Sequence, residues 1–193
     1  MEILGKILGN TSRVKIMRLF LQSKGKVFTK KDVTKRSRTD ESVTRKEIKL
    51  LYNIGFLKKH SSGWSLNTNF QYITQFEELL IKSGSIDRKS IIELFRKTGK
   101  IKLIIISGLF IKAEDTRVDI LIVGDKLKQS KIEEGIKKIE AEMGIELAFV
   151  VFDTKEFVYR LDMYDKLVRD ILDFPHEVIF ASKELSTQTL KKA

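Results

Sequence analysis

The sequence predicts an α+β protein with two parts: a helix-rich N-terminal part that ends in a β-hairpin, and a C-terminal α/β part with a small mixed sheet. Three observations support this fold class. Apolar residues recur at helical spacing as far as Gly55, two short strand-like runs follow, and strands then alternate with helices from about residue 100. With 193 residues the chain has room for two small domains. We expect a first domain over residues 1–69, a connecting helix over 70–83 and a second domain over 84–193.

The apolar spacing in the N-terminal part predicts a short opening helix followed by three longer ones. Thr11 is a candidate cap for the first of the three, whose apolar residues run from Val14 to Leu21. Thr29 and Asp32 have the spacing of a capping box, so a helix is expected from there to about Ser37. A tight polar turn over residues 38–40 then leads into a helix that ends at Gly55.

A β-hairpin is expected directly after Gly55. Residues 56–59 and 64–67 read as its strands and residues 60–63 as its turn. Two helices joined by a short turn, after an earlier helix and before a hairpin, have the element order of a winged helix-turn-helix. Trp64 in this hairpin either packs against the core as an anchor or serves as a platform for base stacking.

The rest of the chain predicts alternating helices and strands. Helices are expected over 70–83, from about 86 to 98, over 131–143, and as one long helix from a cap at Thr154 to the residue before Pro175. The expected strands are 103–107, 118–123, 146–152 and 178–180.

The charge of the chain is concentrated at its N-terminal end. The chain has 37 Lys and Arg against 26 Asp and Glu, a net charge of +11. Residues 1–69 contain 16 basic and 5 acidic residues and so carry the whole excess, whereas residues 70–193 contain 21 of each. A basic domain joined to a neutral one is typical of a protein that binds a polyanion. An acidic membrane surface is the alternative, but it requires exposed Trp, Phe or Leu on one helical face.

Basic side chains lie where a winged helix-turn-helix contacts duplex DNA. On the second helix of the motif, Ser42, Arg45, Lys46 and Lys49 form one stripe, from which Arg45 can bond bidentately to guanine. Lys30 and Lys31 suit backbone phosphates. Lys58, Lys59 and His60 make the hairpin a basic wing. The alternative is that these residues form an ordinary solvated face, as most charge runs do.

Other classes of protein are disfavoured by what the sequence lacks. There are no cysteines, so disulfides, thiolate metal sites and cysteine nucleophiles are excluded. We find no apolar run of the ~20 residues that a membrane-spanning helix needs, and no basic segment followed by an apolar core at the N-terminus. We therefore expect a cytoplasmic protein with no membrane partner.

The stretch SGLFIKAEDTRVDILIVGD, residues 107–125, resembles a degenerate form of the minimal nucleotidyltransferase motif, in which Gly-Ser is followed by an Asp-x-Asp strand. The rest of the chain is similar in element order to bacterial and archaeal regulators that join a winged helix to a nucleotidyltransferase-like domain. In active members of that family, the two carboxylates of Asp-x-Asp hold Mg²⁺ and the Gly-Ser pair binds phosphates. The resemblance thus implies a nucleotidyltransferase-like fold for residues 84–193.

This sequence departs from that motif at its central positions. Asp119 keeps the second carboxylate, but Arg117 replaces the first, and the small pair is reversed to Ser107-Gly108 and followed by Leu109. A guanidinium repels Mg²⁺, so we expect no metal, no cofactor and no catalytic residues. Arg117 would instead pair with Asp119 or with another carboxylate. Glu146 is the carboxylate available on the next strand, and Glu114 and Asp115 are possible substitutes.

The prediction is a transcriptional regulator that binds double-stranded DNA as a homodimer. Its second domain would serve dimerisation, binding of a protein partner, or sensing of a small anionic effector. Two alternatives stay open: a nucleotidyltransferase with an atypical site, and an antitoxin-like repressor that binds a partner protein.

Overall fold

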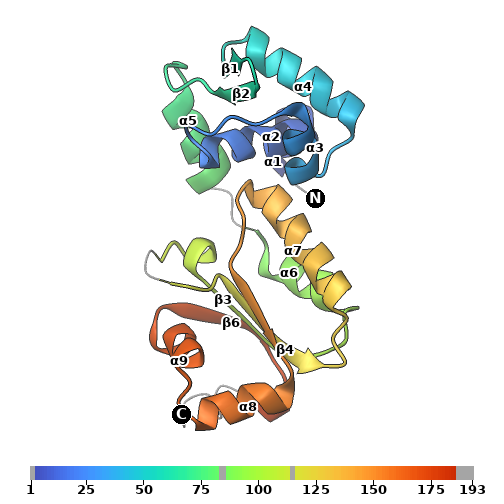
Figure 1. Ribbon diagram of the computed structural model, residues 1–193, viewed down its shortest axis with the longest axis vertical. Helices are drawn as coiled ribbons and strands as arrows, with labels where there is room; N and C mark the ends of the chain where they lie inside the picture. The colour runs from blue at the N-terminus through green and yellow to red at the C-terminus, as the bar shows by residue number, and fades with distance from the viewer. Residues whose placement is uncertain (1–2, 83–85, 114–115, 186–193) are drawn as a thin grey trace. The chain divides into compact units, whose positions relative to one another are not determined.

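The computed structural model describes residues 3–82, 86–113 and 116–185 of the chain and has a mixed α+β fold (Figure 1). The chain divides into two compact units, Met1–Ser85 together with Lys137–Glu146, and Ile86–Ile136 together with Leu147–Ala193. We call residues 3–82 the head and the second unit the body.

The head contains the predicted helices and hairpin. Its helices are α1 (Ile3–Ile7), α2 (Thr11–Gln22), α3 (Lys30–Ser37) and α4 (Glu41–Asn53), and its strands are β1 (Leu57–His60) and β2 (Gly63–Leu66). The capping box of α3 is confirmed: the Thr29 hydroxyl accepts the Asp32 N–H and the Asp32 carboxylate accepts the Thr29 N–H. The predicted cap of α2 is wrong, since Asn10 rather than Thr11 accepts the N–H of Ser12.

Residues 70–82 pack onto the hydrophobic core of the head. They form α5 (Ile73–Glu77) and a π-helical turn, η1 (Glu78–Lys82), rather than one regular helix. The rings of Phe70 and Phe76 lie 5.6 and 6.1 Å from the ring of Phe56, edge to face. Leu80 is buried in the same core, and its carbonyl accepts a hydrogen bond of 2.8 Å from Nε of buried Arg18.

The body is built on a four-stranded mixed sheet with the order β5-β4-β3-β6. Its strands are β3 (Lys100–Ser107), β4 (Ile120–Asp125), β5 (Phe149–Phe152) and β6 (His176–Ala181). β4 and β5 are parallel, and the other two pairs are antiparallel. The helices are α6 (Arg88–Phe95), η2 (Gly108–Phe110), α7 (Gln129–Met143), α8 (Thr154–Asp162), α9 (Lys166–Asp173) and η3 (Lys183–Leu185); α7 crosses the division between the two units.

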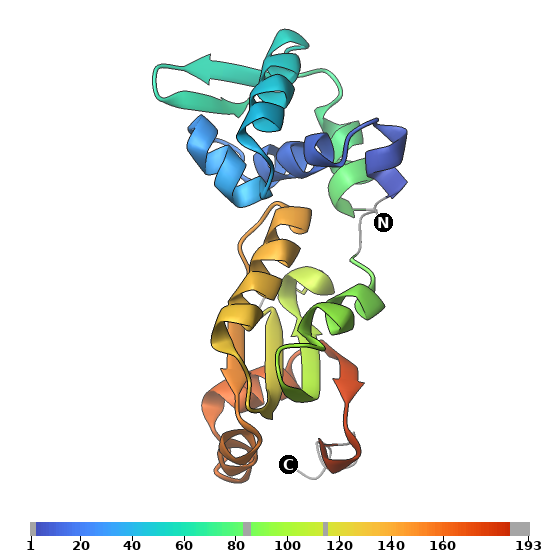
Figure 2. The ribbon, with the colours of Figure 1, turned by 90° about the vertical axis from the view of Figure 1, so that its right-hand side faces the viewer.

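Helices cover both faces of this sheet. Leu103 and Ile105 of β3 belong to a core with the apolar residues of α8 and α9. Ile104 and Ile106 are fully buried as well, and since side chains alternate along a strand they point to the opposite face. Figure 2 shows α6 and the beginning of α7 on that second face, where a Cβ atom on Gly135 of α7 would lie 2.7 Å from the ring of Phe95 of α6.

Three sequence predictions for the body are wrong. The long helix expected from Thr154 to Pro175 is two helices, because Tyr164 adopts a left-handed conformation (φ +53°) and Asp165 caps a new helix by accepting the N–H groups of Leu167 and Val168. Its first cap is Asp153 and not Thr154. The strand expected over 146–152 begins only at Phe149.

In the described part of the chain, no helix combines the length and apolar character that crossing a membrane requires.

Candidate nucleic-acid interface

The turn between α3 and α4 is fixed by a chain of hydroxyl groups. Arg38 ends α3 in a left-handed conformation with φ of +51°. Ser37 donates to the carbonyl of Val33, and its hydroxyl also lies 2.8 Å from that of Thr39, which lies 2.7 Å from that of Thr44 in α4. Thr44 is fully buried. These bonds join the end of one helix to the first turn of the next.

The predicted stripe on α4 faces solvent. Thr44, Ile48 and Leu51 are buried and define the inner face of the helix at spacings of four and three. All four predicted contact residues lie on the exposed side: Ser42, Arg45, Lys46 and Lys49. The structure therefore brings this part of the predicted site together on one helix face.

Glu47 is the acidic residue in the middle of α4, and it points into the head. Its side chain is almost completely buried. Oε2 accepts a hydrogen bond of 2.7 Å from Nε of Arg13, and Oε1 accepts one of 2.8 Å from the side-chain amide of Asn10. Arg13 also donates to the carbonyl of Leu8. The negative charge of Glu47 is thus neutralised inside the head and does not reduce the positive charge of the exposed face.

Glu41, in the first turn of α4, is the acidic residue that does reach this face. It forms an ion pair with Lys30 of α3, and its Oε1 lies 3.8 Å from Nη2 of Arg45. The hydrogen bond from Lys30 lowers the pKa of Glu41, so this carboxylate is charged at neutral pH. Lys30 and Arg45, both predicted to contact DNA, therefore share an acidic partner that a phosphate group would have to replace.

The other predicted lysines carry uncompensated charge. Lys31 is exposed on α3, and Lys58 and Lys59 are exposed on β1. Within residues 3–82 as described, none of these three, nor Lys46 or Lys49, forms an ion pair. Five lysines of the head are consequently available to anions in solution.

The hairpin is tied to the rest of the head through Trp64. The main-chain N–H of Trp64 donates to the carbonyl of Phe28, and the N–H of Phe28 donates to the carbonyl of Trp64, at 2.9 and 2.8 Å. The Trp64 ring packs on the core of the head, which favours its interpretation as an anchor. His60, the third predicted wing residue, is exposed at the tip of β1, and its Nε2 lies 2.8 Å from the hydroxyl of Ser65.

Sequence reasoning missed Arg36 of α3. Its guanidinium lies 5.3 Å from the centre of the Phe28 ring, a cation–π contact, and it forms an ion pair with Glu146 at 3.2 Å. An arginine on the predicted helix could have been noticed, but its ion-pair partner Glu146 is distant in sequence, so no local pattern indicates that pair. Glu146, the predicted third carboxylate of the body, precedes β5 and does not lie on it.

Asp119 fixes the loop after β3, within the stretch for which a nucleotidyltransferase-like motif is predicted. Its carboxylate is 8 % exposed; Oδ1 accepts the N–H of Leu109 at 2.9 Å and Oδ2 accepts the N–H of Ala148 at 2.8 Å. Ser107 is buried too, and its hydroxyl donates to the carbonyl of Val118. Gly108 has φ of +50°, and a Cβ atom there would lie 2.3 Å from Oδ1 of Asp119, so the loop requires glycine at this position.

Arg117 does not contact Asp119. Its side chain is largely exposed, and its Nε lies 3.6 Å from Oδ2 of Asp170 in α9, so it pairs with another carboxylate. Glu114 and Asp115 lie outside the described residues. Among the described residues, no group of three Asp, Glu or His side chains could hold a metal ion. With each oxygen of Asp119 accepting a backbone N–H and the neighbouring ligand position occupied by an arginine, these residues do not fit the magnesium site that the resemblance implies.

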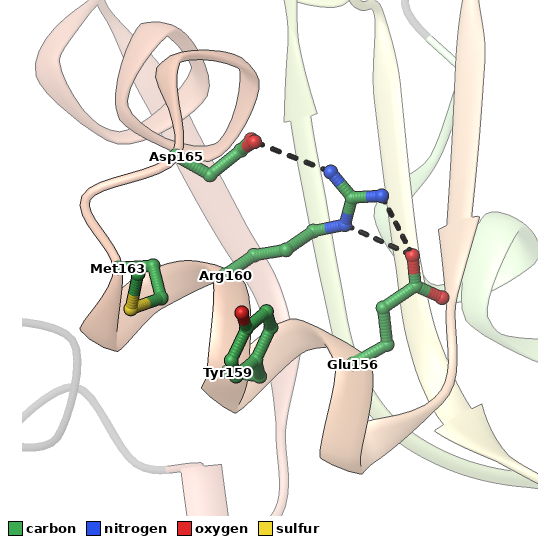
Figure 3. Close-up of a pocket in the computed structure, with 5 residues that line it drawn as sticks. All are labelled: Glu156, Tyr159, Arg160, Met163 and Asp165. Carbon is green, nitrogen blue, oxygen red and sulfur yellow. Dashed lines mark hydrogen bonds and ion pairs between the residues drawn. The ribbon is translucent and has the colours of Figure 1, made fainter.

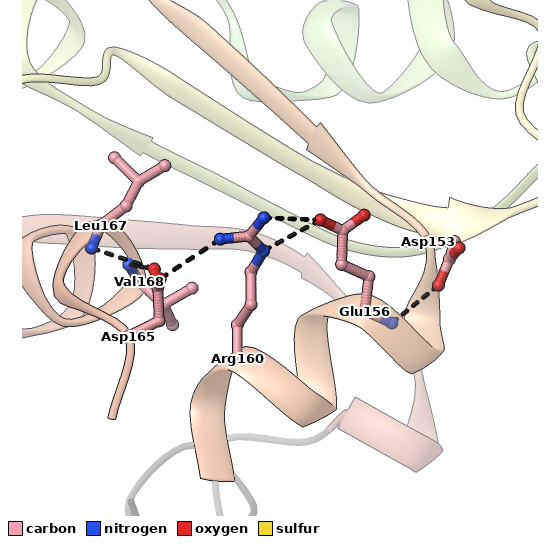
Figure 4. Close-up of polar contacts among 6 residues, drawn as sticks. All are labelled: Asp153, Glu156, Arg160, Asp165, Leu167 and Val168. Carbon is pink, nitrogen blue, oxygen red and sulfur yellow. Dashed lines mark hydrogen bonds and ion pairs between the residues drawn. The ribbon is translucent and has the colours of Figure 1, made fainter. Parts of the chain in front are cut away.

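An open hollow lies at the junction of α8 and α9. Glu156, Tyr159, Arg160, Met163 and Asp165 line it (Figure 3). Arg160 joins the two helices, since its guanidinium bonds to Glu156 at 2.9 Å and to Asp165 at 3.2 Å, while Asp165 caps α9 (Figure 4). The same guanidinium lies 4.9 Å from the centre of the Phe152 ring. One arginine bonds to both carboxylates and so links α8 to the start of α9, which is a structural role.

No protein-family model, curated protein or solved structure matches this chain.

Proposed function

We propose that this chain is a DNA-binding transcriptional regulator and that α4 is its recognition helix. One observation carries the proposal: α4 turns Arg45, Lys46 and Lys49 outward on one face and turns Glu47 inward to Arg13. A solvated face with no binding role has no need to remove its central acid from the surface. On a recognition helix, the inward turn of Glu47 removes a negative charge from the middle of the face that approaches the phosphates, while Glu41 in the first turn is held by Lys30 and Arg45.

Each element of the head has a defined part in this proposal. The N-terminal half of α4 enters the major groove, where Arg45 donates to O6 and N7 of a guanine. Lys31 of α3 and Lys58 and Lys59 of β1 contact phosphates and set the register of the head on the duplex. The hydroxyl chain from Ser37 to Thr44 supports this arrangement, because it joins the end of α3 to the first turn of α4.

The body, in this proposal, has no catalytic role and serves assembly into a homodimer, sensing of an anionic effector, or binding of a partner protein. The bonding of Asp119 supports this: its carboxylate joins the loop after β3 to the segment before β5. A homodimer would match a DNA site with two-fold symmetry, in which each head reads one half-site.

The test is DNA binding by the full chain with two single variants. Arg45→Ala should flatten the preference among sequences selected from a random pool, because a bidentate base contact contributes about 1–3 kcal/mol of discrimination. Lys31→Ala should weaken binding about equally for all sequences, since a phosphate contact carries no sequence information. Lys166→Ala, an exposed lysine of the body, is the control.

Two results would overturn the proposal. One is binding that does not weaken as salt is raised, because neutralising phosphates releases counterions. The other is an Arg45→Ala variant that selects the same site with undiminished discrimination.

A further inference from the structure

The neutral total charge of the body conceals an uneven distribution. Residues 96–131 contain nine Lys and Arg against four Asp and Glu, an excess of five, whereas residues 132–193 contain nine against thirteen. The positive charge of the protein is therefore not confined to the head, and the first of these two segments calls for an explanation of its own.

The fold gathers six of these cations at one end of the sheet. In the antiparallel register of the two strands, Lys100 at the start of β3 lies opposite Asp125 at the end of β4. The turn after α6 and the turn before α7 are also in contact: the N–H of Lys128 donates to the carbonyl of Thr98 at 2.7 Å, and a Cβ atom on Gly99 would lie 2.7 Å from the carbonyl oxygen of Lys126. In Figure 1 the end of α6, the tip of β4 and the start of α7 meet in this region. We call the following set the loop cluster: Arg96, Lys97, Lys100, Lys126, Lys128 and Lys131.

Most of the positive charge of the loop cluster is uncompensated. All six side chains are exposed. Arg96 pairs with Glu93 at 3.2 Å, but none of the five lysines forms an ion pair with any residue that the structure describes. Of the nearby carboxylates, Asp153 accepts the N–H of Glu156, and Asp125 accepts the N–H of Thr154 and offsets part of the charge of Lys100. Five like charges on adjacent turns repel one another, and an anion that binds there relieves that repulsion.

The chemistry of the loop cluster indicates the kind of anion. Lysine ammonium groups are hydrated point charges on long flexible stems and meet phosphates at variable spacing, whereas arginine is the residue for fixed bidentate recognition of a single anion. Five exposed lysines spread over two turns thus suit a chain of phosphates better than one small molecule.

We propose that the loop cluster binds the phosphate backbone of DNA without regard to sequence, as a second DNA contact on the same chain. The inference rests on the proposed function, because DNA is taken to be the ligand of the head. A second, sequence-independent contact raises the affinity for any duplex and keeps the protein on DNA between specific sites.

The test compares two triple variants of the full chain that remove the same charge. One is Lys97→Gln, Lys128→Gln and Lys131→Gln in the loop cluster; the control is Lys89→Gln, Lys166→Gln and Lys183→Gln elsewhere on the exposed surface of the body. Affinity for a long duplex of random sequence is measured at several salt concentrations. The loop-cluster variant should bind about tenfold or more weakly, with a salt slope reduced by about 2–3, since each phosphate contact contributes about 0.9 to that slope. The control should change binding less than about twofold. Thermal unfolding checks that both variants are folded.

The possible outcomes separate this inference from the proposed function. If the loop-cluster variant binds like the control while Lys31→Ala and Arg45→Ala weaken binding, the inference is wrong and the proposed function stands. If only the loop-cluster variant weakens binding, the inference stands and the head is not the reader of DNA. If none of these variants weakens binding, both are wrong.

Discussion

Arg13 of α2 and Glu47 of α4 form an ion pair of 2.7 Å that joins α2 to the candidate recognition helix of the head. The carboxylate is almost fully buried, whereas the Arg13 side chain is 28 % exposed, so the pair lies at the edge of the core. Asn10, which caps α2, donates to the same carboxylate. Glu47 therefore adds a polar contact to the buried inner face of α4, opposite the exposed lysines.

Glu47→Ala should lower the free energy of unfolding of the head by about 2 kcal/mol, because it leaves Arg13 and Asn10 without their acceptor. The partial exposure of Arg13 keeps the loss below that for a fully buried pair. Fluorescence of Trp64, the only tryptophan, reports denaturant unfolding of the head. Glu78→Ala, an exposed acid on η1, is the control and should change stability by less than about 0.5 kcal/mol. An equal loss in both variants would show that the buried pair contributes nothing special.

Asp119→Asn should destabilise the body by about 2 kcal/mol, because the amide nitrogen of Asn cannot accept the backbone N–H that one carboxylate oxygen now accepts. Arg117→Ala, at an exposed position, is the matched control and should have little effect on unfolding followed by circular dichroism.

We also expect calorimetry to show no binding of ATP, GTP, CTP or UTP that depends on Mg²⁺. Magnesium-dependent nucleotide binding that Asp119→Asn abolishes would identify Asp119 as a metal ligand and favour the enzyme alternative.

How far the sequence predicts the fold depends on how local each interaction is. The capping box of Thr29 and Asp32 spans three residues and is read directly from the sequence. Arg13 and Glu47 are 34 residues apart, so nothing in the local pattern around either one shows that the acid turns inward. The break between α8 and α9 has no glycine or proline to mark it, although Asp165 is a residue type that caps helices and could have indicated a new start.

The candidate sites divide in the same way. Helical spacing alone places Ser42, Arg45, Lys46 and Lys49 on one exposed face, and the structure agrees. The pairing of Lys30 with Glu41 joins two helices, and the loop cluster is assembled by the antiparallel register of β3 and β4. A count of charges over residues 70–193 gives zero and hides that cluster, because a sum carries no information about position.

Stability of the body should depend on pH through Arg88 of α6 and Glu177 of β6, which are 2.8 Å apart. The hydrogen bond from Arg88 lowers the pKa of Glu177 below its ordinary value of 4.5. A carboxylate whose pKa is lower in the folded state stabilises that state above its ordinary pKa and loses this contribution as the pH falls through the folded value. The side chains of Arg88 and Glu177 are 34 % and 43 % exposed, so solvent screening keeps the contribution of this ion pair to stability below about 1 kcal/mol.

The measurement is unfolding of the wild type and Glu177→Gln between about pH 7 and about pH 3, where the difference should shrink as Glu177 becomes protonated. Arg88→Gln should reproduce the loss at neutral pH, and the double variant should add little to either single one. A difference between wild type and Glu177→Gln that stays constant down to the lowest pH would contradict this account.

Glu41→Gln should strengthen DNA binding, by about threefold to tenfold at moderate salt, because it removes the carboxylate that competes with phosphates for Lys30 and Arg45. The matched control is Glu78→Gln on η1. It removes the same charge from an ion pair with Lys82, whose distance of 3.8 Å equals that between Glu41 and Arg45. Because both variants raise the net charge equally, only a carboxylate close to the bound duplex should give a large effect, and this effect should diminish as salt is raised. Filter binding or fluorescence anisotropy on one duplex, with melting temperatures as a check of folding, provides the comparison. If Glu78→Gln strengthens binding as much as Glu41→Gln does, the gain reflects net charge alone. If Glu41→Gln leaves the affinity unchanged, the first turn of α4 does not approach the phosphates, and the surface that reads DNA must lie elsewhere on the head.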